Sequence, residues 1–168
     1  MNKTIDCEDT LTAKGTVASK NIILDNSKDR IIRFLNLVDD QFHVKLSERV
    51  NIEDYSTKLS KAAMNYYLVI DEKDVGHLGF YVNKSDGFLF ISSIALMKDF
   101  EGRGLAGKLI GFLKDYAVNL QIYKVSLHVH KEASNVVRFY KKHGFVITND
   151  NKDNYVMSCE IKCINNEI

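Results

Sequence analysis

Proline and tryptophan are both absent from this chain of 168 residues, and cysteine occurs only three times. Without proline, the turns depend on glycine, asparagine, aspartate and serine, which do lie between the apolar runs. Cys7 stands alone, and the pair Cys159 and Cys163 has no second pair or histidine at metal-ligand spacing. The sequence therefore predicts reduced structural thiols and no metal site.

Two further features are missing, a strong charge of one sign and a long hydrophobic run. The 23 basic and 22 acidic residues leave a net charge of +1, which attracts neither a nucleic acid nor an anionic membrane. No apolar run approaches the roughly 18 residues that span a bilayer. The opening MNKTIDCEDTLTAKG also lacks the apolar core of a secretory signal. We therefore expect a cytoplasmic protein with no nucleic-acid partner and no membrane partner.

Length and composition fit one ordinary globular domain, since 45% of the residues are hydrophobic and 27% are charged. The beginning of the chain is polar and weakly periodic, apart from NIILD at residues 21–25. We expect residues 1–26 to form an N-terminal extension, either partly ordered or added to the sheet as an edge strand. Residues 27–168 are expected to form the single domain.

Apolar residues at steps of three and four predict four helices. These cover residues 28–38, a segment from Asn51 or Asp54 to about Ala63, residues 105–120 and residues 134–143.

Between the helices, runs rich in β-branched and aromatic residues predict six strands. These cover residues 65–72, 75–83, 88–96, 123–130, 145–148 and 154–161. Short turns join the first three, which must be antiparallel neighbours because a parallel return needs about a dozen residues. The helix at 105–120 supplies one parallel crossover, between strands 88–96 and 123–130. We therefore predict a mixed α/β (α+β) fold with a mostly antiparallel sheet flanked by helices.

The stretch EGRGLAGKLI, residues 101–110, places three glycines where a helix must begin. Glycine costs roughly 1 kcal/mol in a helix relative to alanine, so a cluster there indicates that a ligand approaches the backbone. Gly102, Gly104 and Gly107 match the GxGxxG pattern of dinucleotide-binding proteins. The GxxxxGK loop of NTPases also fits up to its last position, where Leu109 replaces the hydroxyl that should hold magnesium. Both patterns predict a phosphate at the amino end of the helix.

A third pattern fits the same glycines together with a second stretch further on. EGRGLA, residues 101–106, resembles the (Q/R)xxGx(G/A) loop of the GNAT superfamily of acyl-CoA-dependent N-acetyltransferases, with Glu101 in place of the usual Gln or Arg. NVVRFYKKHGF, residues 135–145, resembles the NxxAxxFYxKxGF signature of the same family. The two motifs follow the predicted antiparallel strands in the order that the family has, and the resemblance runs from about Lys28 to Ile161.

The resemblance implies a GNAT fold, in which the two central parallel strands splay apart in a V, and acetyl-CoA as the cofactor. It implies direct transfer of an acetyl group to a primary amine of a small molecule or a peptide. The main chain around the glycines would bind the pyrophosphate, and the preceding strand would pair with the pantetheine arm. The cofactor-binding residues that it implies are Ile94, Ala95, Leu96, Glu101, Gly102, Arg103, Gly104, Leu105, Ala106, Gly107, Lys108, Asn135, Tyr140 and Lys142.

Tyr140 is also the residue for which the resemblance implies a catalytic role, the protonation of the departing thiolate. A tyrosine carries its proton at neutral pH, which suits this role. The sequence does not identify the general base, because residues 88–96 contain no carboxylate. His77, His128 and Asp86 are the nearest candidates.

The resemblance implies that the first half of the chain, Ile31–Tyr67, covers the open end of the sheet and selects the acceptor amine. Asp39 with Asp40 could receive a cationic amine there, and Tyr66 with Tyr67 could provide an aromatic wall.

The sequence constrains the oligomeric state and the class of protein less closely than it does the fold. The predicted strand at residues 154–161 is a candidate exposed edge through which two copies could pair as a homodimer. Two further classes of protein stay open at this point: an acyl-CoA-binding module without catalysis, and an NAD(P)-dependent oxidoreductase.

Overall fold

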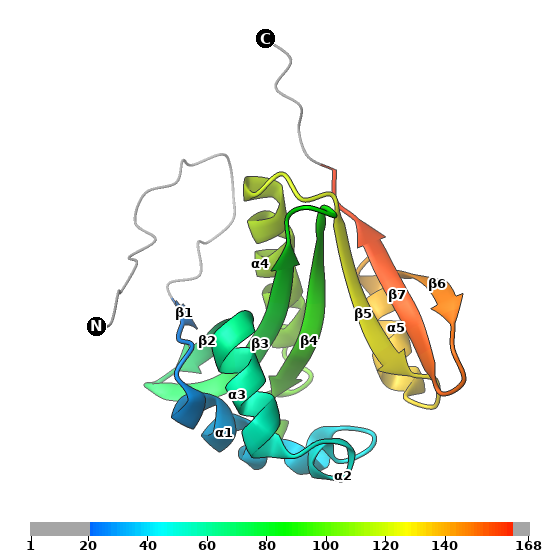
Figure 1. The fold of residues 1–168 in the computed structure, drawn as a ribbon. Helices are drawn as coiled ribbons and strands as arrows, with labels where there is room; N and C mark the ends of the chain where they lie inside the picture. Colours follow the sequence, from blue (N-terminus) through cyan, green and yellow to red (C-terminus); the bar gives the residue numbers. More distant parts are fainter. Residues whose placement is uncertain (1–20, 163–168) are drawn as a thin grey trace.

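Seven strands form one mixed sheet in the order β1-β2-β3-β4-β5-β7-β6 within residues 21–162, which the computed structural model describes (Figure 1). The strands are β1 Ile22–Leu24, β2 Met64–Ile70, β3 Lys73–Asn83, β4 Phe88–Leu96, β5 Lys124–His130, β6 Val146–Asp150 and β7 Asn154–Glu160. All neighbouring strands are antiparallel except β4 and β5, which run parallel. The prediction of a mostly antiparallel sheet with one parallel crossover is confirmed.

Helices cover both faces of this sheet, with α1 and α3 in front in Figure 1 and α4 and α5 behind. The helices are α1 Lys28–Leu37, η1 Asp39–Gln41, α2 Leu46–Arg49, α3 Ile52–Ala62, η2 Lys98–Phe100, α4 Leu105–Asn119 and α5 Ser134–Lys142. The sequence predicts α1, α3, α4 and α5, whereas α2 is too short to show a helical period. Within residues 21–162, no helix has both the length and the apolar character that crossing a bilayer would require.

Two apolar cores lie on opposite faces of the sheet. The core under α4 contains Leu78, Leu109 and Leu113, and the core under α1 and α3 contains Ile31 and Leu59. Alternation along the strands decides which core each side chain joins.

The two adjacent tyrosines of β2 are separated by this alternation. Tyr66 belongs to the core under α4, and Tyr67, which is fully buried, belongs to the core under α1 and α3. They therefore face opposite ways, and the expected aromatic wall built from both is not present.

The edges of the sheet are β1 and β6. β1 pairs with β2 and lies inside the predicted extension 1–26, of which residues 1–20 fall outside the described residues. β7 is paired on both sides, with β5 and with β6, so the expectation that residues 154–161 form an exposed edge is wrong. On the edge strand β6, Val146 and Ile147 remain 61% and 38% accessible.

The two parallel strands separate halfway along their length. β4 and β5 share four residue pairs, which end at Ile91 and Leu127, and no further pair joins them in the described chain. Ser92 is an extra residue on β4, inserted opposite the step from Gly79 to Phe80 on β3. Such a bulge bends its strand and increases the local twist. The carboxyl ends of β4 and β5 consequently diverge, and the V-shaped splay is confirmed (Figure 1).

Candidate functional site

The glycine-rich stretch forms the turn that starts α4 at the carboxyl end of β4. Gly102 and Gly104 have left-handed backbone angles, with φ of 73° and 74°, a region that glycine enters at no steric cost. A Cβ at either position would meet nothing within 4 Å beyond its chain neighbours, so the space outside the turn is open.

The amino end of α4 carries uncompensated partial positive charge. Gly104 is the N-cap, no described side chain caps the helix, and its first turn contains no acidic residue. The first N–H groups of a helix have no acceptor within the helix, and the helix dipole favours an anion there. This turn is therefore built to receive a negatively charged group.

Gly107 has a different role from the other two glycines. A Cβ at Gly107 would lie 3.0 Å from Cε1 of His143, the residue that follows α5. The missing side chain lets the end of α5 approach the first turn of α4. Burial, together with the cations Lys114 and Lys142, lowers the pKa of His143. His143 is thus a neighbour of the loop that the sequence did not reveal, because only the packing of two helices brings it there.

The other side chains of the loop include one buried apolar residue and three exposed charged residues. Leu105 is buried beneath the turn, whereas Glu101, Arg103 and Lys108 are exposed. The Arg103 guanidinium lies over the ring of Phe100, 5.0 Å from its centroid. Two cations and one anion therefore flank the open main-chain groups.

The carboxyl half of β4 offers a free strand edge. Ile94, Ala95 and Leu96 pair with β3 on one side, and past Ile91 no described strand pairs with the other side. Ile94 and Leu96 pack with the core under α4, and Ala95 packs with the core on the opposite face. The side chains are therefore used in packing, while the main chain faces the gap to β5.

Helix α3 contributes a contact to this edge that no motif indicated. The Tyr55 hydroxyl donates to the Ser92 carbonyl over 3.0 Å and lies 2.7 Å from the Ser92 hydroxyl. Burial raises the pKa of Tyr55, so the hydroxyl keeps its proton for this bond. The bulge of β4 is thereby tied to the helical layer in front of the sheet.

Tyr140 lies on α5 within the core that also contains Leu96 and Leu105. It is only 4% exposed, and its ring contacts those of Phe139 and Phe145 at centroid distances of 5.2 Å and 5.3 Å. Burial raises the pKa of Tyr140, so the hydroxyl is protonated at neutral pH. The end of β4, the start of α4 and α5 thus each contribute a side chain to the same core.

Asn135 and Lys142, the other two expected contacts on α5, are exposed residues near its two ends. Their positions differ by seven residues, which is about 10 Å along a helix. They can therefore meet only different parts of an extended ligand.

The candidate bases are placed very differently by the fold. His77 is fully buried, with Nε2 3.1 Å from Oδ1 of Asn65 and Nδ1 3.4 Å from the Ser93 hydroxyl. Asp86 lies in the turn before β4, where Asn83 donates to it over 2.7 Å, and so sits at the opposite end of that strand from the glycine turn. His128 is exposed on β5. Of the three, only His128 is accessible near the diverging strand ends.

The buried state of His77 predicts a pH-dependent stability. Burial lowers the pKa of His77 from 6.5 to about 3. Between these two values His77 is protonated in the unfolded chain and neutral in the folded chain. The stability contributed by neutral His77 is present above about pH 6.5 and is lost as the pH falls toward 3, by up to about 1.4 kcal/mol per pH unit. We expect urea unfolding between about pH 7 and pH 5 to show a smaller slope in His77→Gln than in the wild type. His128→Gln, at an exposed histidine, should keep the wild-type slope; equal slopes in wild type and His77→Gln would contradict the prediction.

The acidic pair proposed to receive an amine is engaged within its own loop. Asp39 accepts from the main-chain N–H and the hydroxyl of Ser47, at 2.7 Å and 2.6 Å. Asp40 forms an ion pair with Lys45 over 2.8 Å. Both carboxylates therefore stabilise the connection from η1 to α2.

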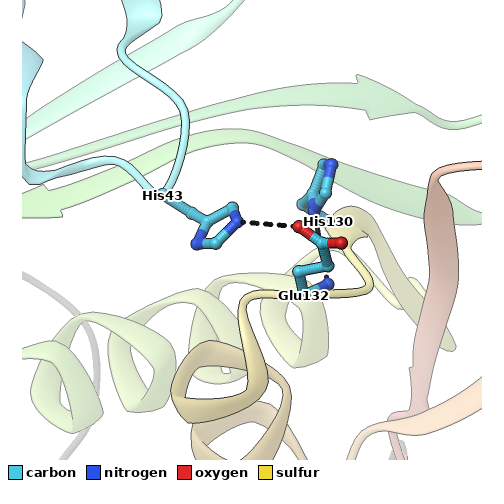
Figure 2. Close-up of side chains that lie close together, drawn as sticks. All are labelled: His43, His130 and Glu132. Carbon is cyan, nitrogen blue, oxygen red and sulfur yellow. Dashed lines mark hydrogen bonds and ion pairs between the residues drawn. The ribbon is translucent and has the colours of Figure 1, made fainter.

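This connection carries His43 to the end of β5 (Figure 2). Nε2 of His43 lies 3.6 Å from Oε2 of Glu132, and the His43 and His130 rings are 5.0 Å apart between centroids. His130 and Glu132 are two residues apart at the end of β5, whereas His43 comes from a distant segment, so no spacing motif joins all three.

A family model identifies the class of protein to which this fold and this open helix start belong. Residues 31–145 match the model of the acetyltransferase (GNAT) family. The match covers more than half of the chain, and the chain belongs to the GNAT acetyltransferase family. This assignment replaces the dinucleotide and NTPase interpretations of the same glycines.

Solved structures support the fold. The chain is similar to the ribosomal-protein-S18-alanine N-acetyltransferase from Escherichia coli, with 14% identity and a TM-score of 0.66 over 88% of this chain and 98% of that one. It is similar to a GNAT family acetyltransferase from Elizabethkingia anophelis with acetyl-CoA bound (17%, TM-score 0.65, covering 84% and 99%). It is also similar to the PaiA N-acetyltransferase from Thermoplasma acidophilum in complex with coenzyme A (12%, TM-score 0.65, covering 83% and 98%).

Proposed function

We propose that this protein transfers the acetyl group of acetyl-CoA directly to a primary amine of a small molecule or a peptide. The observation that carries the proposal is the open, uncapped start of α4 beside the free edge of β4, in a chain of the GNAT family. Solved neighbours that contain acetyl-CoA or coenzyme A add support for the cofactor.

The residues at the start of α4 fit a pyrophosphate. The main-chain N–H groups from Gly102 to Gly107 would bind its oxygens, and glycine at the two left-handed positions leaves room for the approach. Arg103 and Lys108 would add positive charge. Asn135 and Lys142, at the two ends of α5, would contact other parts of the cofactor.

The free edge of β4 fits an extended ligand arm. The main chain of Ile94, Ala95 and Leu96 would pair with the arm as with another strand. Bound acetyl-CoA supplies the acetyl group as an activated thioester. A main-chain N–H near Leu96 would stabilise negative charge that develops on the carbonyl oxygen.

Tyr140 would hold and deliver a proton. Burial keeps its hydroxyl protonated, and its apolar surroundings exclude water. A neutral phenol can donate to a departing thiolate, which is general acid catalysis. The carrier of the amine proton is a separate group and is not Tyr140.

A two-stage experiment tests this function. Calorimetry with coenzyme A and acetyl-CoA, beside NAD as a control nucleotide, should show binding of the first two only. Thiol release from acetyl-CoA is then measured over amines that include sugar amines, polyamines, antibiotics, amino acids and peptide N-termini. Binding with no turnover on any amine would favour an acyl-CoA-binding module without catalysis. Absence of binding would remove the proposal.

A further inference from the structure

We propose that His43, His130 and Glu132 form a binding site for a divalent metal ion of the zinc class. One ligand atom from each, two imidazole nitrogens and a carboxylate oxygen, lies within 4.8 Å of the other two. Figure 2 shows the His43 ring and the Glu132 carboxylate turned toward each other, with His130 beside them. The site shares no residue with the cofactor contacts proposed above.

The spacing of the ligand atoms is close to what an ion needs. Zinc bonds of 2.0–2.2 Å in a tetrahedron place neighbouring ligand atoms about 3.4 Å apart. Nε2 of His43 and Oε2 of Glu132 are already 3.6 Å apart. The widest separation in the set, at most 4.8 Å, has to close by no more than about 1.4 Å.

Both segments that carry the ligands are held by hydrogen bonds of their own. The loop with His43 is closed across its base by Asp39 and Ser47. On the other side, the Lys131 N–H donates to the Asp153 carbonyl over 3.0 Å. Because both segments are already held in place, binding of an ion would cost less conformational entropy than it would in an unfolded chain.

One contact of His130 has to change. The Glu132 N–H donates to Nδ1 of His130 over 3.3 Å, which is long for a hydrogen bond. In this contact Nδ1 acts as the acceptor, so its lone pair is occupied until an ion displaces the amide hydrogen. The ion would take that lone pair in place of the weakly bound amide hydrogen.

The ligand set selects the class of ion. Two imidazoles suit zinc and its neighbours among the transition metals, whereas magnesium and calcium prefer oxygen ligands. The side chains of His43 and Glu132 are 39% and 79% exposed, so an ion can enter and keep a water as its fourth ligand. Such an ion would join the helical layer in front of the sheet to the end of β5.

Metal titration of tag-free protein tests the site. The parent protein, in which all variants of this test are made, carries Cys7→Ser and Cys163→Ser, so that these two thiols cannot compete as ligands. Equilibrium dialysis with Zn²⁺ should show one bound ion per chain, and Co²⁺ should give the visible absorption of a tetrahedral site. Zn²⁺ should also raise the melting temperature, because it binds only the folded arrangement. Protons compete for the imidazoles, so binding should weaken as the pH falls.

Matched variants decide between the site and incidental binding. His43→Ala, His130→Ala and Glu132→Gln should each weaken Zn²⁺ binding by more than about tenfold. His128→Ala removes an exposed histidine of the same strand and should bind Zn²⁺ like the parent. Circular dichroism verifies that each variant is folded. Two results would contradict the site: no Zn²⁺ binding by the parent protein, or a loss of Zn²⁺ affinity in His128→Ala as large as that in His43→Ala. Each would show that His43 and Glu132 form only an ion pair. Either result overturns the proposal without touching the proposed acetyl transfer.

Discussion

Gly104→Val should lower the affinity for coenzyme A by about a hundredfold or more, equivalent to roughly 2.7 kcal/mol. The new side chain would fill the open space outside the turn, where a Cβ now meets nothing within 4 Å, and would block approach to the main chain. Valine at φ +74° is also strained by about 1–2 kcal/mol, so the variant should unfold at a lower temperature. Calorimetry with coenzyme A measures the first effect and thermal unfolding the second.

Gly111→Val is the matched control for this change. Gly111 lies within the same helix, a Cβ there also meets nothing within 4 Å, and its φ is not in the left-handed region. We expect its coenzyme A affinity to stay within about twofold of the wild type. Wild-type affinity in folded Gly104→Val would show that the ligand does not approach this turn.

Tyr140→Phe should lower turnover by about a hundredfold, with the KM for acetyl-CoA changed by less than about twofold. The substitution removes the proton donor and keeps the ring, which still contacts Phe139 and Phe145. Binding and folding should therefore survive, while the thiolate loses the group that protonates it. Steady-state rates with the best amine from the screen give both parameters.

Tyr123→Phe provides the comparison for loss of a hydroxyl. The Tyr123 hydroxyl donates to the Asp86 carbonyl over 2.9 Å, at the amino end of β5 and away from the glycine turn. Its turnover should equal that of the wild type. If Tyr140→Phe keeps turnover within about twofold, or roughly 0.4 kcal/mol of barrier, Tyr140 acts only in packing.

Much of the fold follows from local patterns in the sequence. The prediction of a strand over residues 88–96 agrees with β4, whose Leu89, Ile91, Ile94 and Leu96 all pack in the core under α4. β3 begins at Lys73, two residues before the predicted start. The turn before it is tighter than expected because Asp71 and Glu72 both have positive φ, which is uncommon for glutamate.

The site was less predictable where it depends on contacts between distant segments. The open turn at Gly102 and Gly104 is visible as a motif, but the packing of Gly107 against His143 is set by the meeting of two helices. Burial of His77 beside Asn65 depends likewise on the helical layer above β3. When helices cover both faces of a sheet, both sets of alternating side chains are buried. Alternation along one strand therefore does not reveal that a polar residue such as His77 is inaccessible.

The narrow strip of pairing between β4 and β5 has a mechanical consequence. It divides the sheet into two leaves, β1 to β4 and β5 to β7, which share four residue pairs. Rotation of one leaf about this strip would change the width of the opening while every ladder inside each leaf stays intact. Helix α4 packs against β3, β4 and β5 and so connects the two leaves. In the proposed acetyl transfer, the size of amine that fits the opening would then depend on how far the two leaves separate as well as on the residues that line the opening.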